Sequence, residues 1–131
     1  MIKGVVLRNF MSYSNASVPL YPGLNLIAGP NGAGKSSILL AISLVLGQAY
    51  TERSKRLSDL IRWGEDQARI SLLLDNSQKE GKRPFPQYHM DTVDVTRILR
   101  KGGDYAYLLQ GRPTSKERVV EVFTRIGVNP D

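Results

Sequence analysis

The chain has 131 residues, a length that fits one domain, and 41% of them are hydrophobic and 23% charged, as in folded globular proteins. Its 18 lysines and arginines against 12 acidic residues give a net charge of +6, which suits a polyanionic partner. The absence of cysteine excludes disulfides, thiolate metal sites and thiol nucleophiles. The longest apolar stretch, Ile38 to Leu46, is interrupted by Ser43 and is too short to cross a bilayer, so we expect no membrane partner. The strand-like start from Met1 to Arg8 has no cleavage site, and we therefore expect a cytoplasmic rather than a secreted protein.

Residues with high β-propensity dominate the first part of the chain. They predict strands over Ile2 to Phe10, Ala16 to Tyr21 and Leu24 to Ala28, with a Pro-Gly turn between the second and the third. The hydrophobic period then becomes that of a helix, with one face formed by Ile38, Ala41, Ile42, Val45 and Leu46. Leucines at 39, 40 and 44 make the opposite face apolar as well, which predicts a helix buried on all sides and ended by Gly47.

The second half of the chain has the pattern of a sheet followed by a helix. After a polar and basic stretch, residues 57–64 predict a helix of about two turns, with Trp63 in the core. Residues 68–75 predict a strand, 76–88 a surface loop or the tip of a β-ribbon next to His89, and 90–101 with 105–109 a hairpin. A capping box with Thr114 as the cap and Glu117 as its partner opens a last helix. Its predicted core face consists of Val119, Val122, Phe123 and Ile126.

The strongest motif lies between the third strand and the first helix. The run Gly29-Pro30-Asn31-Gly32-Ala33-Gly34-Lys35-Ser36 matches the phosphate-loop pattern G-x-x-x-x-G-K-[ST] in full. Glycines let successive backbone amides approach a phosphate, and the start of the helix adds its dipole and its unpaired N–H groups. Lys35 supplies positive charge to the β- and γ-phosphates, and the Ser36 hydroxyl is a ligand for Mg²⁺. A chance match is disfavoured because a strand precedes the motif and a helix follows it, so we expect nucleotide binding.

Several classes of NTPase use such a loop. A GTPase is disfavoured because the chain has no Asn-Lys-x-Asp string. A free-standing kinase or NTPase needs an acidic residue at the end of an apolar strand, and Asp75 after Ile70 to Leu74 is a candidate for holding Mg²⁺ through water. The competing interpretation is a half-buried strand whose acidic end enters a loop. It is favoured because the strands from 68 to 109 have the alternation of an antiparallel sheet rather than a βαβ repeat.

Four groups of residues resemble the N-terminal head segment of SMC (structural maintenance of chromosomes) proteins. They are Asn9-Phe10-Met11-Ser12-Tyr13; Pro22 to Ile27 with the phosphate loop and Ala41-Ile42-x-x-x-Leu46-Gly47; Ser58 to Gly64 with Ala68-Arg69-Ile70; and Gly127-Val128-Asn129-Pro130. The resemblance covers nearly the whole chain and is loose from 76 to 88. The related double-strand-break repair ATPase shares much of this pattern.

The resemblance implies an α/β fold, the N-terminal lobe of an ABC-type P-loop NTPase head, with an antiparallel sheet beside the strand and helix of the phosphate loop. Residues 1–131 are expected to form this lobe as a fragment of a longer chain. In this family the C-terminal head segment of the same protein supplies the Ser-Gly-Gly signature, the acidic Mg²⁺ ligand and the catalytic glutamate, and this chain contains none of them. Two heads then pair around ATP and Mg²⁺ to organise chromosomes or repair DNA. The resemblance therefore implies an ATPase that acts only when assembled and that is associated with the chromosome in the nucleoid or nucleus.

The same resemblance assigns roles to individual residues. Asn31 to Ser37 wrap the triphosphate of ATP, with Lys35 as a catalytic residue. Arg53 corresponds to a catalytic-site arginine that approaches the nucleotide and links it to DNA, and Arg56 is the alternative because the length of this loop varies. The competing interpretation for either residue is a solvated cation of the loop. Arg56 and Leu57 are expected near the adenine.

Other cations are candidates for contacts with DNA phosphates, and ordinary surface solubility is the alternative explanation for them. They are Lys79, Lys82, Arg83, Arg97, Arg100 and Lys101. Phosphate contacts carry no sequence information, so DNA binding through them is expected to be non-specific and salt-sensitive.

Overall fold

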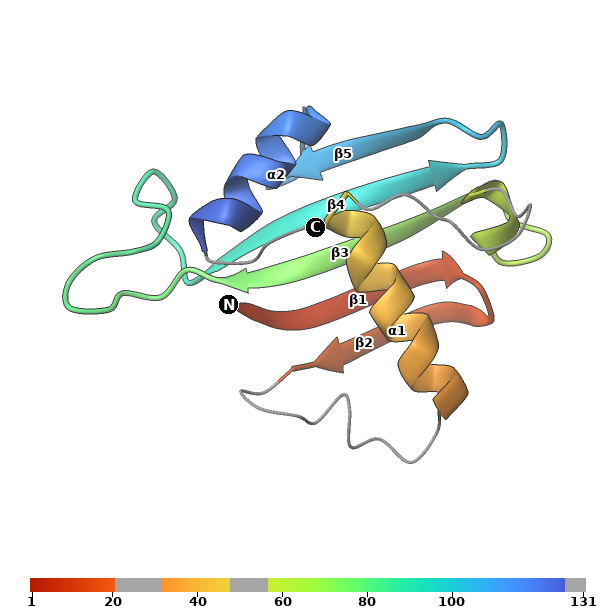
Figure 1. The fold of residues 1–131 in the computed structure, drawn as a ribbon, viewed down its shortest axis with the longest axis horizontal. Coiled ribbons are helices and arrows are strands. Elements are labelled where there is room, and N and C mark those ends of the chain that lie inside the picture. The colour runs from red at the N-terminus through yellow and green to blue at the C-terminus, as the bar shows by residue number, and fades with distance from the viewer. Residues whose placement is uncertain (21–31, 48–56, 127–131) are drawn as a thin grey trace.

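An antiparallel sheet of six strands forms the frame of the protein (Figure 1). The computed structural model describes residues 1–20, 32–47 and 57–126. In the order of the sheet the strands are β2 (Tyr13–Pro19), β1 (Ile2–Phe10), β3 (Gln67–Asp75), β4 (Thr92–Arg100), β5 (Tyr105–Leu109) and β6 (Arg112–Thr114). The helices are α1 (Gly32–Val45), the 3₁₀ helix η1 (Leu57–Leu60) and α2 (Lys116–Arg125).

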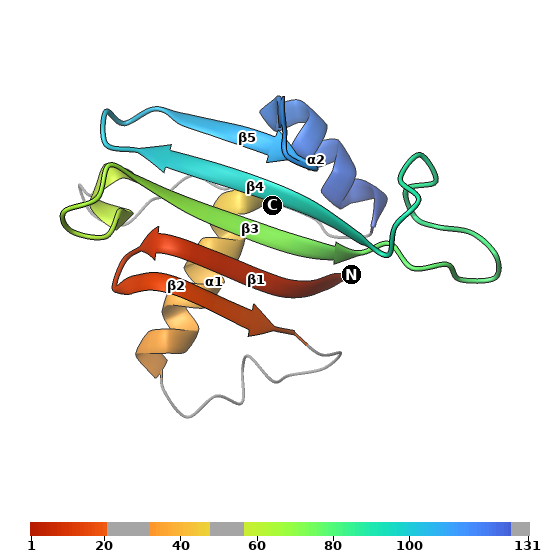
Figure 2. The same cartoon turned by 180° about the vertical axis from the view of Figure 1, so that it is seen from behind.

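Both α-helices lie on one face of the sheet, as the views from the two sides show (Figures 1 and 2). We call this side the helix face and the opposite side the open face. Because side chains alternate along a strand, each strand contributes to both faces. In β4, Val95 and Leu99 belong to the hydrophobic cluster under the helices, whereas Ile98 is buried on the open face, outside that cluster.

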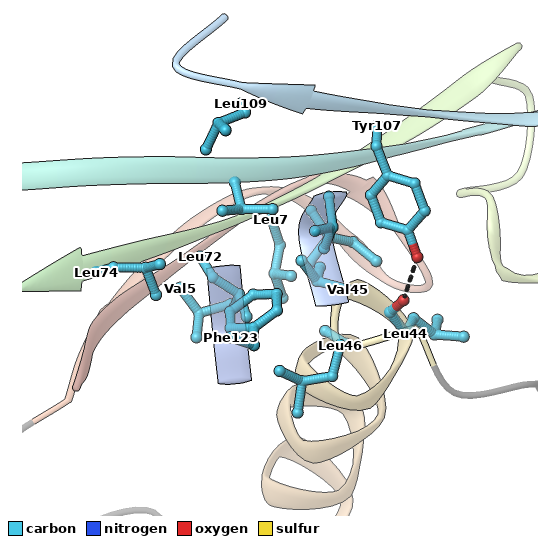
Figure 3. Packing of buried hydrophobic residues seen from close by; sticks show 14 of the residues in the cluster. Val5, Leu7, Leu44, Val45, Leu46, Leu72, Leu74, Tyr107, Leu109 and Phe123 are labelled. Atoms are coloured by element: carbon cyan, nitrogen blue, oxygen red, sulfur yellow. Dashed lines mark hydrogen bonds between the residues drawn. The ribbon is translucent and has the colours of Figure 1, made fainter. Parts of the chain in front are cut away.

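The core lies between the helices and the sheet. Leu44 and Val45 at the end of α1 and Phe123 of α2 are at most 1% exposed. Figure 3 shows these side chains gathered with Leu7 of β1 and Leu72 of β3. Burial of a side chain of this size stabilises a fold by roughly 1.5–3 kcal/mol, so this contact fixes α1 on the sheet.

Most of the predicted elements are confirmed. The first strand has the predicted bounds, the strand over 68–75 begins one residue earlier, and β4 and β5 form the predicted hairpin. The second strand begins at Tyr13 rather than Ala16, because Tyr13 pairs with Phe10 in a tight hairpin. The short strand β6 was not predicted, since three residues that include a proline show no alternation. The strand predicted from Leu24 to Ala28 lies outside the described residues.

The helix predicted over 57–64 is wrong beyond its first four residues. Only η1 is helical, because Ile61 pairs with Phe10 of β1 and the Arg62 amide donates to the Asn9 carbonyl at 2.7 Å. This pairing with the β1–β2 turn draws the chain out of the helix. Trp63 then falls in a turn and is 96% exposed, so its predicted place in the core is wrong as well.

Two further details of the helices differ from the prediction. Leu39 is 46% exposed, so α1 is not buried on all sides by the described residues. The cap of α2 is Ser115 rather than Thr114, since the Ser115 hydroxyl accepts a hydrogen bond from the Arg118 amide at 3.1 Å. The buried face of α2 contains Val119, Val122 and Phe123, as predicted. In the parts of the chain that the structure describes, no helix has the length and apolar character needed to span a membrane.

Candidate nucleotide-binding site

The phosphate-loop motif runs into the first turns of α1. The helix begins with motif residues and their neighbour: Gly32, Ala33, Gly34, Lys35, Ser36 and Ser37. The first turn carries no acidic side chain, so nothing on the helix itself opposes an anion near its unpaired amide groups. The predicted helix directly behind the loop is thus confirmed, and the roles of these residues stay predictions. The start of the motif, Gly29, Pro30 and Asn31, lies outside the described residues.

The other end of α1 is held by the β4–β5 hairpin. The Leu44 carbonyl accepts a hydrogen bond from Arg97 Nη1 at 2.7 Å and one from the Tyr107 hydroxyl at 3.3 Å, the latter drawn in Figure 3. The Arg97 guanidinium lies over the Tyr105 ring, 4.3 Å from its centroid. The last turn of α1 has no basic residue of its own, so Arg97 supplies from the sheet the positive charge that favours a helix C-terminus.

Arg97 is therefore not a DNA contact, and that prediction is wrong. It is 6% exposed and points to the helix face, in line with Val95 and Leu99 of the same strand. The signal was present in the sequence, because an arginine at an inward position of a buried strand needs an acceptor inside the protein. The Leu44 carbonyl, 53 residues earlier, was not identifiable as that acceptor.

The remaining cations do not form one surface. Arg100 ends β4 and Lys101 begins the turn after it. Lys79, Lys82 and Arg83 lie in the loop that follows β3. Figure 1 shows this loop and the β4–β5 turn at opposite ends of the sheet. A single DNA molecule along one face would have to span the full length of β4, about 30 Å, to meet both groups.

The loop after β3 is folded around one buried amide. Asn76 is 0% exposed, and its Nδ2 donates to three loop carbonyls at 3.0, 3.1 and 3.2 Å. Its Oδ1 accepts from the Phe85 amide at 2.7 Å. Arg83 donates to the Asn76 carbonyl at 3.0 Å and to the Asp91 carboxylate at 2.7 Å. Arg83 thus stabilises the loop and is engaged within it.

Asp75 ends β3 away from the start of α1 (Figure 1). Its Oδ1 accepts from the Ser77 amide at 2.9 Å, and its Oδ2 lies 3.6 Å from Lys79 Nζ. Hydrogen bonding by Ser77, with a smaller effect of the Lys79 charge, lowers the pKa of Asp75 below its ordinary value of 3.8. These contacts support the interpretation as a strand end that enters a loop, and they do not favour Asp75 as the Mg²⁺-binding acid of a free-standing kinase or NTPase.

The loop predicted to approach the base and the γ-phosphate is only partly described. Arg53 and Arg56 lie outside the described residues. Leu57 begins η1 and packs, half-buried, against the core cluster. Its predicted position near the adenine stays a prediction.

The chain is similar to SMC proteins over almost its whole length. It is 38% identical over 139 residues to structural maintenance of chromosomes protein 6 of Saccharomyces cerevisiae, which covers 98% of this chain and 12% of that protein. It is 35% identical over 136 residues to structural maintenance of chromosomes protein 2 of Gallus gallus, with 98% of this chain and 11% of that protein covered. The chain therefore spans only about an eighth or less of the relatives it matches.

The fold agrees with these sequence matches. A solved structure from work on ATP-driven dimerization and DNA-stimulated activation of SMC ATPases superposes with a TM-score of 0.81 at 30% identity, over 98% of this chain and 81% of that one. The family described as the RecF/RecN/SMC N terminal domain matches residues 1–131. The all-antiparallel sheet, the helix that starts within the phosphate loop and these matches agree. The chain belongs to the RecF/RecN/SMC N-terminal domain family, as the N-terminal segment of an SMC head with the α/β fold of an ABC-type P-loop NTPase.

Proposed function

We propose that residues 1–131 form the N-terminal lobe of an SMC-type ATPase head and provide the ATP-binding half of its active site. The observation that carries the proposal is the complete phosphate-loop motif at the start of α1, in a chain that belongs to this family. The rest of the catalytic machinery then comes from the C-terminal head segment of the same protein. The activity serves chromosome organisation or DNA repair, and the protein acts on chromosomes in the nucleoid or nucleus.

The residues of the motif suit ATP and Mg²⁺. The acid-free first turn of α1 leaves its amide groups available to the phosphates. Within this proposal, Gly29 to Ser37 surround the triphosphate, Lys35 neutralises charge on the β- and γ-phosphates, and Ser36 is the ligand for Mg²⁺. The metal, when bound, neutralises charge that develops on the transferred phosphoryl group. Arg53, with Arg56 as the alternative, then approaches the nucleotide, and Leu57 lies near the adenine.

A second head is the proposed partner on ATP binding. The similar structure comes from work on ATP-driven dimerization and DNA-stimulated activation of SMC ATPases, which supports this mode of action for the family. The exposed Leu39 on α1 provides apolar surface for the missing part of the head. DNA is the proposed polyanionic partner, bound without sequence specificity, and the net charge of +6 favours it.

The test is a Lys35→Ala variant of the head assembled from this chain and its C-terminal segment. We expect ATP affinity to fall by at least about tenfold, because a charge-assisted contact to phosphate contributes about 1.5–3 kcal/mol. Lys101→Ala, which removes an exposed cation at the β4–β5 turn, is the matched control and should leave ATP affinity unchanged. Equal ATP affinity in the wild type and in Lys35→Ala would exclude the proposed phosphate site.

The isolated 131-residue chain provides the second test. It should release phosphate from ATP no faster than its own Lys35→Ala variant, and activity should appear when the C-terminal segment is added. Robust turnover by the isolated chain would show that the active site is complete without that segment.

A further inference from the structure

The open face of the sheet carries a hollow that the ATPase function does not use. Figure 2 views the sheet from this side, with α1 and α2 behind it. Two rows of paired residues cross the strands here. One row runs through Asn15, Arg8, Arg69, Ile98 and Ala106, and the next through Ser17, Val6, Ser71, Thr96 and Leu108. Members of both rows, with Asp94 and Gly111, line a hollow of about 440 Å³.

Arg8 and Arg69 form a like-charged pair in this hollow. They are directly opposite each other on β1 and β3, which places their Cβ atoms about 5 Å apart, and like charges in this position destabilise a sheet. Among the residues that the structure describes, neither arginine has a carboxylate partner. The Arg69 Nε is enclosed and has no hydrogen-bond partner. Two cations held side by side without a carboxylate partner call for an anion from outside the described residues.

The rest of the lining indicates which kind of anion fits. Val6 and Leu108 contribute apolar surface beside the arginines, and the Ser71 and Thr96 hydroxyls, 2.7 Å apart, lie between them. Asp94 places a carboxylate in the same hollow. A single carboxylate on a protein segment can reach the two arginines while the apolar side chains beside it contact Val6 and Leu108, whereas a nucleic-acid backbone brings a continuous row of phosphates and no aliphatic side chains.

We propose that this hollow, defined by Arg8, Arg69, Val6 and Leu108, is a docking site for an acidic segment of a partner protein. The carboxylate of that segment accepts hydrogen bonds from the Arg69 guanidinium, and its charge relieves the repulsion between the two arginines. The neighbouring apolar side chains of the segment pack on Val6 and Leu108. Docking here leaves the helix face, and with it the proposed ATP site on α1, untouched.

The test measures peptide binding to the full-length protein by fluorescence anisotropy. The probe is a labelled, capped peptide, Gly-Ser-Val-Glu-Leu-Asp-Ser-Gly, and its control has Gln and Asn in place of Glu and Asp. We expect Arg69→Gln to weaken binding of the acidic peptide by about tenfold or more, as loss of a charged hydrogen bond does. Arg8→Gln should weaken it by a smaller factor, and Lys101→Gln, a charge-matched control at the β4–β5 turn, should leave it within about twofold.

The outcomes separate this site from general charge and from the ATP site. No saturable binding of the acidic peptide, equal binding of the neutral peptide, or an equal loss with Lys101→Gln would each overturn the proposal. The proposal would also be overturned if Arg69→Gln weakened binding of a labelled 20-base-pair DNA duplex and left binding of the acidic peptide unchanged. Unchanged ATP affinity in Arg69→Gln shows that the variant is folded. If Arg69→Gln is unfolded, the same binding measurements are made with Arg8→Gln, which changes an exposed residue. Unchanged binding of the acidic peptide to Arg8→Gln would then overturn the proposal.

Discussion

The guanidinium of Arg97 and the carbonyl of Leu44 join the sheet to the end of the phosphate-loop helix through a hydrogen bond of 2.7 Å. Leu44 belongs to the last turn of α1, where carbonyl groups lack their usual partner four residues on, and its carbonyl also accepts a hydrogen bond from the Gly47 amide at 3.2 Å. Arg97 thus satisfies one of these groups and fixes the distance between β4 and the helix. The helix that begins at the proposed ATP site is therefore secured to the sheet at its opposite end.

Replacing Arg97 by methionine should lower the free energy of unfolding by about 2 kcal/mol. A hydrogen bond from a charged donor contributes about 1.5–3 kcal/mol, and the contact between Arg97 and the Tyr105 ring adds about 1 kcal/mol. Methionine avoids the free-energy cost of burying the charge, but we expect this gain to be smaller than the two lost contributions. Arg97→Lys keeps the charge and should lower the free energy of unfolding by less than Arg97→Met does. Urea titration measures both variants, with Arg100→Met, whose ion pair with Asp104 is exposed, as a control that should change stability by less than about 0.5 kcal/mol. A change for Arg97→Met as small as that of the control would show that the contact is dispensable.

Alkaline unfolding should depend on Tyr107. Burial raises the pKa of this phenol above its ordinary value of 10.0, against a smaller opposing effect of Arg97. Below pH 10 the phenol is neutral in both states, and its contribution to stability is constant. Above pH 10 it ionises first in the unfolded chain, so unfolding becomes more favourable as pH rises towards the pKa of the folded state.

The variant Tyr107→Phe has no phenol to ionise, so it should lose less stability than the wild type as pH rises above 10. At pH 8 it should be less stable by about 1 kcal/mol, because the Leu44 carbonyl loses one of its three hydrogen bonds. Above pH 10 the difference in stability from the wild type should shrink as pH rises. Thermal unfolding at closely spaced pH values checks this, and a constant difference would contradict the assigned environment of the phenol.

Removing the Asn76 side chain should unfold the loop between β3 and β4. Asn76→Ala leaves one buried carbonyl, two partly buried carbonyls and the Phe85 amide without their partner, and each such group costs about 1–3 kcal/mol unless water reaches it. Because the loop lies at the end of the sheet, we expect water to enter and the loss to be limited to about 3 kcal/mol. Asn76→Asp keeps the acceptor but not the donor and should behave similarly. Hydrogen exchange should show faster amides in 77–91 and little change in β1, and unchanged exchange in the loop would refute its dependence on Asn76.

The carboxylate of Asp75 should be dispensable for ATP hydrolysis by the assembled head. It accepts from the Ser77 amide and faces Lys79, away from the start of α1. We expect the turnover of Asp75→Asn to stay within about twofold of the wild type. Lys35→Ala should lower turnover by at least about tenfold, because it removes a charged contact to the phosphates. Loss of phosphate release in Asp75→Asn at unchanged ATP affinity would instead support a role for Asp75 at the metal.

The strands β3 and β5 were predictable because their residues alternate between buried and more exposed positions. Residues 68–75 and 105–109 show this in the sequence alone. The fate of Trp63 was not predictable, because the helical pattern of 57–64 is overruled by the pairing of Ile61 with Phe10, a contact between segments 51 residues apart. Local pattern is a weak influence when a distant strand offers hydrogen bonds.

The residues of the candidate site and its surroundings were likewise predictable in part. The phosphate loop could be identified from the motif, since its chemistry resides in consecutive residues. Arg97 could not be assigned, because its acceptor belongs to another element and becomes known only when α1 is placed on the sheet. The opposed pair Arg8 and Arg69 depends on the register of β1 with β3, which the sequence does not specify.

The single non-consecutive pairing in the sheet, β1 with β3, has a consequence for folding order. The β1–β2 hairpin and the β3–β6 meander each form from strands that are neighbours in the chain, which is fast. The long connection between them contains α1 and the phosphate loop, and its closure entropy must be overcome when the two pieces join. We therefore expect the proposed ATP-binding segment to be completed last, and a nucleotide that binds only the joined lobe to shift the folding equilibrium towards it.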